Sequence, residues 1–482
     1  MDGVWTADQV RAAEAELMAR LPEGTLMRRA AFGLAVAARR MLGGTVAGAR
    51  VALLVGAGDN GGDALWAGAE LRRRGVGVVA VLLRPERAHP AGLAALRRAG
   101  GRVVAAQDAD AAARAVQRAQ LVIDGIVGIS GKGALRDPAP ALVAAAADAG
   151  VPVLACDLPS GVDCDTGEVT GPAVTAAATV TFGARKPVHV LAADRCGPVR
   201  LVDIGLGPHL PAPHAHVLET ADVAAHWPLP GPTDDKYSQG VTGIAAGSAT
   251  YPGAAVLATG AAVLATSGMV RFAGSAADGV KARWPEVIAT DTFASAGRVQ
   301  AWTVGPGIGT DDAGRDLLAA VLDAQVPVCA DADAVTLLAK HEDLRSEVRG
   351  RPIVITPHAG EFARIAGEVG PDRVAAARRA AAELGVTVLL KGNVTVVADP
   401  DGRALVHPSP TSWAATAGSG DVLSGIVGAL LAAGLEPWWA AGCAAWVHAR
   451  AAGVAASGAP APASAIQAAI PEVLRRLSGQ LH

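Results

Sequence analysis

The chain has 482 residues, of which 51% are hydrophobic, and its 42 basic residues nearly balance 45 acidic ones. This length favours two or three domains, each able to bury a full core. The net charge of -3 gives no electrostatic reason to expect nucleic acid or an anionic membrane surface as a partner, so we expect small-molecule ligands.

Cysteine usage and the amino terminus indicate the cellular compartment. The five cysteines are odd in number and form no C-x-x-C pair, which argues against a disulfide framework and a zinc knuckle. The opening sequence, MDGVWTADQV, lacks a basic region followed by an apolar core, so we expect no secretory signal. We therefore predict a protein of the reducing cytoplasm.

Short β-branched runs alternate with alanine-rich helical stretches over residues 50–205. This alternation predicts βαβ units and a mostly parallel sheet. Three of the predicted strands end in GAGDNGGD, DGIVGISGKG and DLPSG. Because active sites of such sheets lie at the carboxyl ends of the strands, these clusters predict a site.

The first of these clusters fits the G-x-G-x-x-G pattern of a nicotinamide dehydrogenase, with Gly56, Gly58 and Gly61. That fingerprint requires an acid near the end of the second strand to bind a ribose hydroxyl. The sequence has Leu83 and Arg84 there. We therefore reject hydride chemistry for this loop.

A proline-rich segment over residues 205–235 predicts a linker and a domain boundary. We place the first domain at 1–212 and the second at 220–482. We interpret His209, His214 and His216 as solvated linker side chains, because no carboxylate or thiolate is spaced to complete a metal site with them.

A second α/β pattern begins near residue 240 and ends in long helices after residue 418. Residues 237–270 carry no charge but are broken by Gly, Ser, Thr and Pro252, so we predict a strand, a turn and a buried helix there instead of a membrane span.

The segment TAGSGDVLSGIVGALLAAG, residues 416–434, carries the clearest chemical signal. Gly418 and Gly420 allow a tight turn whose backbone N–H groups, at the start of a helix, hold phosphoryl oxygens. Asp421 then lies in the first helical turn, where its carboxylate can accept the proton of a substrate hydroxyl. The alternative is an Asp that only caps a buried helix.

Together with KYSQG, YPGAAVLA, GPGIGTD, DADAV, TPHAGEF and LLKGNVTVV, in this order, that segment resembles the ADP-dependent NAD(P)H-hydrate dehydratase family over residues 220–480. The resemblance implies a ribokinase-like α/β fold. It also implies that ADP phosphorylates the hydroxyl of a hydrated nicotinamide ring, after which phosphate leaves and the ring double bond returns. The implied cofactors are ADP and Mg²⁺.

The same resemblance assigns roles to individual residues. Asp421 is the implied base. The implied contacts to the hydrated nucleotide are Ala254, Gly307, His358 and Asp421. The implied contacts to the adenine nucleotide are Lys391, Gly392, Asn393, Val394, Thr395 and Gly420.

Residues 1–210 resemble the NAD(P)H-hydrate epimerase family through GTLMRRAA, GDNGGD, DGIVGISGKGALR, DLPSGVDCDTG and TFGARKP. The implied fold is a Rossmann-like three-layer αβα domain. The implied substrate contacts are Asp59, Asn60, Gly61, Gly62, Asp63, Gly128, Ile129, Ser130, Gly131, Lys132, Gly133, Ala134 and Asp157.

Epimerisation at the hydroxyl-bearing carbon needs an acid and a base, whether the ring opens or water leaves and returns. Asp157 is the candidate base and Lys186 an electrostatic or acid partner; the alternatives are a turn-capping Asp and a surface Lys. Asn60, Asp124 and Ser160 match the family's potassium site, and one carboxylate with neutral oxygens suits a monovalent cation.

Two positions depart from the epimerase pattern. Asp59 stands where the family usually has Asn, and Ala64 where it usually has Gly; GISGKG also varies a glycine-threonine-glycine turn. An extra carboxylate beside a dinucleotide phosphate repels it unless a cation or Lys132 compensates.

Fusion of the two activities has a chemical reason, because hydration yields two epimers and a stereospecific dehydratase repairs only one. We therefore predict a bifunctional repair enzyme that acts on R- and S-NAD(P)H hydrates, without nucleic acid or membrane partners and as a homo-oligomer. The alternative is a ribokinase-like vitamin-precursor kinase fused to a non-catalytic dinucleotide-binding module.

Overall fold

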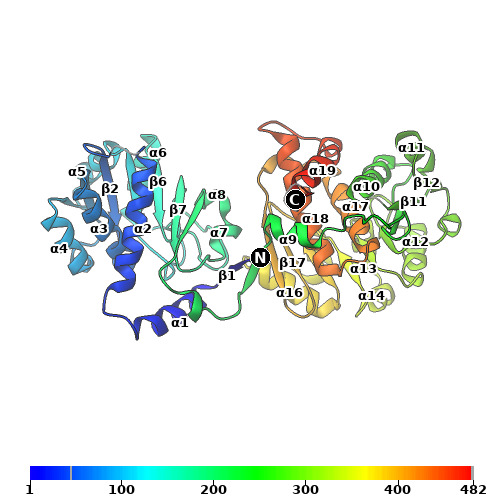
Figure 1. Ribbon diagram of the computed structural model, residues 1–482, viewed down its shortest axis with the longest axis horizontal. Helices are drawn as coiled ribbons and strands as arrows, with labels where there is room; N and C mark the ends of the chain where they lie inside the picture. Colours follow the sequence, from blue (N-terminus) through cyan, green and yellow to red (C-terminus); the bar gives the residue numbers. More distant parts are fainter. Residues whose placement is uncertain (44–45, 267, 479–482) are drawn as a thin grey trace. The chain divides into compact units, whose positions relative to one another are not determined.

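The computed structural model describes residues 1–43, 46–266 and 268–478. They form two compact units: Gly3–His214, and Ala215–His482 together with Met1–Asp2. In Figure 1 the first unit runs from blue to green and the second from green to red. Each unit is an α/β domain built on its own sheet.

The unit Gly3–His214 has a seven-stranded parallel sheet in the order β4-β3-β2-β5-β6-β7-β8. Its strands are β2 (Arg50–Val55), β3 (Gly77–Leu82), β4 (Arg102–Ala105), β5 (Leu121–Gly125), β6 (Val153–Cys156), β7 (Ala178–Phe182) and β8 (Val199–Val202). Its helices are α1 (Ala7–Met18), α2 (Thr25–Met41), α3 (Asp59–Arg72), α4 (Pro90–Arg98), α5 (Ala109–Gln117), α6 (Ala139–Asp148), α7 (Val188–Leu191) and α8 (Ala193–Cys196).

Strand β2 explains why this sheet is covered on both faces. Its side chains alternate between two hydrophobic cores: Leu53 packs with residues of α2 and α3, and Leu54 with residues of α5 and α6. A strand buried on both faces is apolar at successive positions, as the run VALLV is. The predicted three-layer αβα arrangement is confirmed (Figure 1).

The second unit has an eleven-stranded sheet in the order β1-β9-β18-β17-β16-β15-β14-β13-β10-β11-β12. Neighbouring strands are parallel from β12 to β16, and β16, β17 and β18 form an antiparallel meander. The strands are β1 (Asp2–Val4), β9 (Ala215–Val217), β10 (Val241–Ala245), β11 (Met269–Ala273), β12 (Ile288–Thr290), β13 (Ala301–Val304), β14 (Val328–Ala330), β15 (Ile353–Ile355), β16 (Thr387–Leu390), β17 (Val394–Ala398) and β18 (Ala404–Pro408).

A large alanine-rich core lies between this sheet and helices α10, α17, α18 and α19. The helices of the unit are α9 (Thr220–His226), α10 (Pro252–Ala265), α11 (Ala277–Arg283), α12 (Asp312–Asp323), α13 (Asp333–Lys340), α14 (Glu342–Val348), α15 (Ala359–Ala366), α16 (Arg373–Leu384), α17 (Ser419–Ala432), α18 (Pro437–Ala456) and α19 (Ala463–Ser478). The described residues also include short 3₁₀ turns, η1 (Pro85–Arg87) and η2 (Gly207–His209) in the first unit and η3 (Phe293–Ser295) and η4 (Ser412–Ala414) in the second.

The strand and helix predicted within residues 237–270 are present as β10 and α10. In the part of the chain that the structure describes, no helix combines the length and apolar character needed to cross a membrane.

The segment 205–235, predicted as a linker or domain-edge segment, contains the division between the two units at His214 and Ala215, but it is not a plain linker. Strand β9 and helix α9 lie in this segment, and β9 joins the second sheet beside β18, with His216 opposite Leu405. A three-residue strand is too short to show a period, so its pairing partner decides its structure. The interpretation of His209 as solvated is wrong, because its ring is largely covered and Nδ1 lies 3.0 Å from Glu16 Oε1.

Two candidate active sites

The carboxyl ends of β2, β5 and β6 surround a cavity of about 880 Å³ in the first unit. The loops after these strands bring together residues far apart in the sequence. The cavity is lined by most of the predicted epimerase residues: Asp59, Asn60, Asp63, Gly128, Ile129, Ser130, Gly131, Lys132, Gly133, Ala134 and Asp157.

Gly61 and Gly62 lie beneath this surface, buried in the first turn of α3. A Cβ on Gly61 would fall 2.4 Å from the carbonyl oxygen of Gly56, and one on Gly62 would fall 2.9 Å from Met27. These two glycines let the helix approach the strand end, while Asp59, Asn60 and Asp63 face the cavity.

A buried ion pair stands at one side of the cavity. Asp157 follows β6 with a left-handed φ of 68°, and its Oδ1 lies 2.6 Å from Lys186 Nζ. Lys186 is only 1% exposed and also donates to Thr181 Oγ1 at 2.8 Å and to the Phe182 carbonyl at 3.2 Å. Burial opposes ionisation of Asp157, but Lys186 outweighs it and lowers the pKa of this carboxyl below its ordinary value.

His189 holds both members of this pair through their backbones. The Lys186 N–H donates to His189 Nδ1 at 2.9 Å, so the opposite ring nitrogen carries the proton and donates to the Asp157 carbonyl at 2.8 Å. Burial lowers the pKa of His189 to about 4, which keeps the ring neutral. A surface position for Lys186 is excluded by its burial.

Two further carboxyl groups on the cavity, those of Asp63 and Glu14, have raised pKa values, in contrast to Asp157. Burial raises the pKa of Asp63 well above its ordinary value, and the charges of Asp157, Asp59 and Glu14 raise it further. Burial also raises the pKa of Glu14, a residue of α1 that lines the same cavity. The site therefore combines one strongly acidic carboxyl, Asp157, with neighbours that hold their protons more tightly.

The three residues matched to a potassium site are close together. Asp124, which is 0% exposed, accepts from the Ser160 hydroxyl at 2.7 Å and from the Ser160 N–H at 2.9 Å. Asn60 lies against Gly125 and Gly128, just beyond Asp124. Burial raises the pKa of Asp124 to about 6. Within residues 1–43, 46–266 and 268–478, no cluster of three or more His, Cys, Asp or Glu side chains could hold a metal ion.

Basic side chains stand at the same cavity. Arg11, Arg84, Arg87, Lys132 and Arg136 all line it. Acidic side chains line it too, among them Asp59 and Asp137, so the cavity offers both basic and acidic groups to a ligand.

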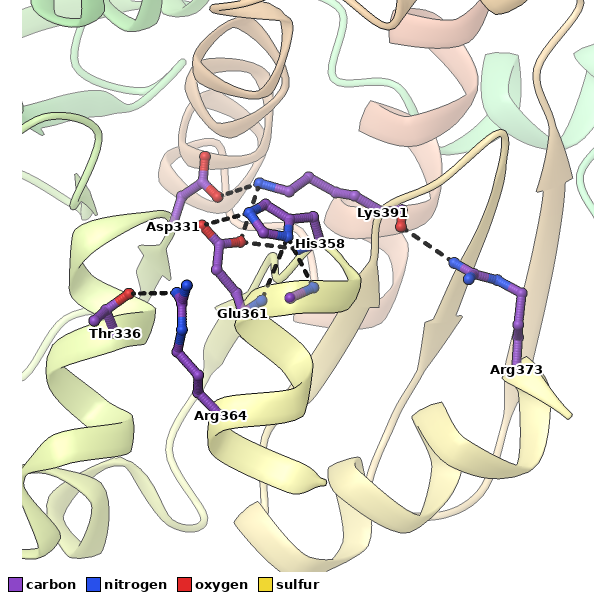
Figure 2. Close-up of polar contacts among 8 residues, drawn as sticks. Asp331, Thr336, His358, Glu361, Arg364, Arg373 and Lys391 are labelled. Atoms are coloured by element: carbon purple, nitrogen blue, oxygen red, sulfur yellow. Dashed lines mark hydrogen bonds and ion pairs between the residues drawn. The ribbon is translucent and has the colours of Figure 1, made fainter. Parts of the chain in front are cut away.

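The second candidate site lies at the carboxyl ends of β14, β15 and β16 in the other unit. Figure 2 shows Lys391, directly after β16, reaching toward Asp331, which follows β14. Lys391 Nζ lies 2.5 Å from Asp331 Oδ1 and 3.8 Å from Glu361 Oε2. Burial opposes the charge on Lys391, but these carboxylates outweigh it and raise its pKa.

His358 and Glu361 belong to the turn that begins α15. His358 Nδ1 accepts from the Gly360 N–H at 3.0 Å, while Glu361 Oε2 accepts from the His358 N–H at 2.9 Å (Figure 2). This reciprocal capping fixes the Glu361 carboxylate beside Lys391.

Asp421 lies in the first turn of α17, as predicted. Burial raises its pKa to about 7; the charge of Asp331 raises it further and Lys391 lowers it. Among the described residues Asp421 has no ion pair of its own, since Lys391 pairs with Asp331. Its carboxyl is therefore a weaker acid and a stronger base than an exposed Asp.

Glycines bring the backbone close to these groups. Gly418 precedes α17 with a φ of 84°, and a Cβ on Gly420 would fall 3.3 Å from Lys391 Nζ. Gly307 has a φ of 68°, and a Cβ there would fall 3.3 Å from Ala254 and 2.9 Å from Tyr251. The turn 418–420 thus lies beside a lysine and two carboxylates, Asp331 and Asp421.

In the predicted nucleotide segment 391–395, residues 391–393 form the turn after β16, and Val394 and Thr395 begin β17. Arg373 donates to the Lys391 carbonyl at 3.1 Å, and Ser412 lies 3.4 Å from Asn393 Oδ1. Asp331 and Glu361 in this site, and Glu14 and His189 in the other, were not predicted. Asp331 had one available signal, since it directly follows a buried strand in DADAV.

Family models cover most of both units. A model described as YjeF-related protein N-terminus matches residues 23–188, and one described as NAD(P)H-hydrate dehydratase matches residues 242–472. A ribokinase-like superfamily protein of Enterococcus faecalis covers 55% of this chain and 96% of its own, with a TM-score of 0.51 and 22% identity, and shares the fold of the second unit.

Two mycobacterial relatives align along nearly the whole chain. Both are named bifunctional NAD(P)H-hydrate repair enzyme Nnr. The Mycobacterium tuberculosis (strain ATCC 25618 / H37Rv) protein is 59% identical over 437 residues, which cover 89% of each chain. The Mycobacterium leprae (strain TN) protein is 58% identical over 452 residues, which cover 93% of each. The chain belongs to the family of bifunctional NAD(P)H-hydrate repair enzymes.

Proposed function

We propose that this chain interconverts the R and S hydrates of NADH and NADPH in its first domain and dehydrates the S epimer in its second, consuming ADP and releasing AMP and phosphate. The observation that carries the proposal is the pair of sites, each with a buried base at the strand ends of an α/β domain, in a chain 59% identical to a named repair enzyme.

In the proposed dehydration Asp421 accepts the proton of the substrate hydroxyl, whose oxygen then attacks the terminal phosphoryl group of ADP. A carboxyl with a pKa of about 7 suits this task near neutral pH. Lys391 and the N–H groups of the 418–420 turn stabilise the charge on the phosphoryl group in transfer. Gly307, His358 and Ala254 hold the hydrated nucleotide, and residues 391–395 with Gly420 hold the adenine nucleotide.

In the proposed epimerisation Asp157 is the base. Its pairing with Lys186 favours the ionised form, and its position on the cavity supports contact between its carboxylate and the bound ring. Asp59, Asn60, Asp63 and residues 128–134 contact the substrate, whose phosphates fit the basic side chains of the same cavity.

Two metal ions belong to the proposal. The donor set of Asn60, Asp124 and Ser160 fits K⁺, because it offers a single buried carboxylate with neutral oxygens. Asp331 and Glu361 offer two carboxylates beside Lys391, which fits Mg²⁺ that also binds nucleotide phosphates. K⁺ would anchor the loops around Asp124, and Mg²⁺ would neutralise phosphate charge.

We further propose a cytoplasmic location and a homo-oligomeric state. The five cysteines are free and buried, which suits a reducing compartment. Sedimentation analysis of the purified chain measures its oligomeric state.

The decisive experiment incubates the full chain with mixed R and S hydrates and ADP and follows the absorbance of the restored reduced ring. We expect complete restoration, with one AMP and one phosphate released per ring. A stable phosphoester in place of free phosphate would contradict the proposal and favour a vitamin-precursor kinase. Recovery of only the S half of the hydrate would contradict the epimerase part of the proposal and leave the dehydratase part standing.

A further inference from the structure

Lys186 cannot donate a proton to a ligand in this arrangement. Its ammonium group donates to Asp157, Thr181 and the Phe182 carbonyl, which uses all three of its protons. The side chain is 1% exposed and does not line the cavity. The acid that epimerisation needs must therefore come from another group that reaches the substrate.

Asp63 has the required position. It lies in α3, one turn beyond Asp59, and lines the cavity with Asp157. Asp63 is 8% exposed, and its Oδ1 is buried without a hydrogen-bond partner among the described residues. The amide nitrogen of Asn60, on the same cavity, is likewise buried and unpartnered. Two such orphaned groups at one cavity mark where polar atoms of a ligand bind.

We propose that Asp63 is the general acid that acts opposite the Asp157 base in the first domain. The inference rests on the epimerase function proposed above and assigns it a second catalytic residue. It follows from the position of Asp63 on the cavity, its orphaned oxygen and the carboxylates around it.

Electrostatics give the two carboxyls opposite protonation states. Burial and the charges of Asp157, Asp59 and Glu14 raise the pKa of Asp63, and Lys186 only partly offsets them; Cys156, also nearby, is neutral because burial raises its pKa. The pKa of Asp157 is lowered by Lys186. Asp63 therefore holds its proton to a higher pH than Asp157 does. Such divergent pairs identify the acid and the base of an active site.

The proposed step balances without an oxidant or a reductant. Asp63 gives its proton to the hydroxyl oxygen as the C–O bond breaks, and the ring nitrogen lone pair forms a C=N bond. The water then adds to the opposite face, the C=N electron pair returns to nitrogen, and Asp157 takes one proton of that water. Solvent carries the proton from Asp157 back to Asp63, which regenerates both groups.

Glu14 is the competing acid, since it lines the same cavity and its pKa is also raised. Glu14 is more exposed than Asp63, and neither of its carboxyl oxygens is both buried and without a hydrogen-bond partner. A buried unpaired oxygen needs a ligand partner more than a solvated one does, which favours Asp63.

The test measures conversion of pure R hydrate to S hydrate by the full chain from pH 5 to 9, without ADP so that the second domain is idle. We expect Asp63→Asn to lower the rate by about 100- to 10,000-fold, down to the spontaneous rate, with KM changed only a few-fold. The alkaline fall of the pH profile, which reports loss of the Asp63 proton, should disappear. Asp63→Glu, which keeps a proton donor, should retain more activity than Asp63→Asn.

Thermal unfolding at pH 8 separates this role from a structural one. A carboxyl whose pKa is higher in the folded chain than in the unfolded chain destabilises the fold as the pH rises above its unfolded value. Asp63→Asn should therefore melt at the same or a higher temperature, whereas loss of a structural residue would lower it.

Two results would overturn the inference: an Asp63→Asn rate within about threefold of the parent chain, or loss of the alkaline limb in Glu14→Gln instead. Failure of the unmodified chain to accelerate epimerisation above the spontaneous rate would instead refute the proposed function itself.

Discussion

The two sites use the same residue types in opposite ways. In the first, Lys186 pairs with the proposed base Asp157 and lowers its pKa. In the second, Lys391 pairs with Asp331, and the pKa of the proposed base Asp421 is about 7. A lysine that pairs with the proposed base keeps that carboxyl ionised. A lysine that pairs with another carboxylate leaves the buried base to titrate near neutrality.

This difference suits two tasks. A base that must stay ionised beside other carboxyl groups benefits from a permanent counter-charge. A base that must take a proton from a poorly acidic hydroxyl benefits from a raised pKa, because its proton affinity approaches that of the group it serves. The following variants test whether the chain separates the two tasks in this way.

Replacement of the second base should have the largest effect. Asp421→Asn keeps shape and hydrogen bonding but cannot accept the hydroxyl proton, so we expect ADP-dependent ring repair to fall by about 100- to 10,000-fold. Ring absorbance measures repair, and calorimetric titration with ADP should show retained binding. Epimer exchange should continue. Repair within a few-fold of the parent rate would make Asp421 a helix cap only.

Replacement of the first base should affect one epimer alone. When Asp157→Ala acts on a mixture of hydrates, the S half should be repaired rapidly. The R half should be repaired only as fast as it converts spontaneously to the S epimer. Biphasic recovery of absorbance measures this outcome. Equal loss for both epimers would refute the separation of tasks between the two domains.

Loss of the proposed potassium site in the first domain should have a smaller effect. Asp124→Ala removes its one buried carboxylate, so binding of potassium and of dinucleotide should weaken together, by about tenfold each. Calorimetric titrations in potassium and in a bulky organic cation measure both. Equal affinities of the unmodified chain in the two salts would exclude the site.

The smallest expected effect is a shift in the pH profile of dehydration when Asp331, the partner of Lys391, is replaced. The charge of Asp331 raises the pKa of Asp421, and its removal also frees Lys391 to lower that pKa. In the parent chain kcat/KM for dehydration should fall as the pH drops through about 7, because Asp421 becomes protonated. Asp331→Asn should move this fall to lower pH, and the control Asp333→Asn, whose charge acts more weakly, should move it less. An unmoved profile would contradict the comparison.

The sequence by itself determined the features that lie within one segment. The glycines and acid of 416–421 predict a phosphoryl-binding turn with Asp421 at a helix start, and α17 begins there. The clusters after β2, β5 and β6 likewise predict a shared edge, and they line one cavity. Local motifs of this kind are readable because turn geometry and strand period depend on neighbouring residues.

Only the tertiary structure decided which side chains pair. Lys186 and Asp157 are 29 residues apart, and Lys391 and Asp331 are 60 apart, so no local pattern links them. Burial, which raises the pKa values of Asp63 and Asp421, likewise depends on elements distant in the chain. Strand β9 escaped prediction for the same reason, because its structure comes from pairing with β18. Long-range contacts fix the charge states, and those states determine which carboxyl gives a proton and which takes one.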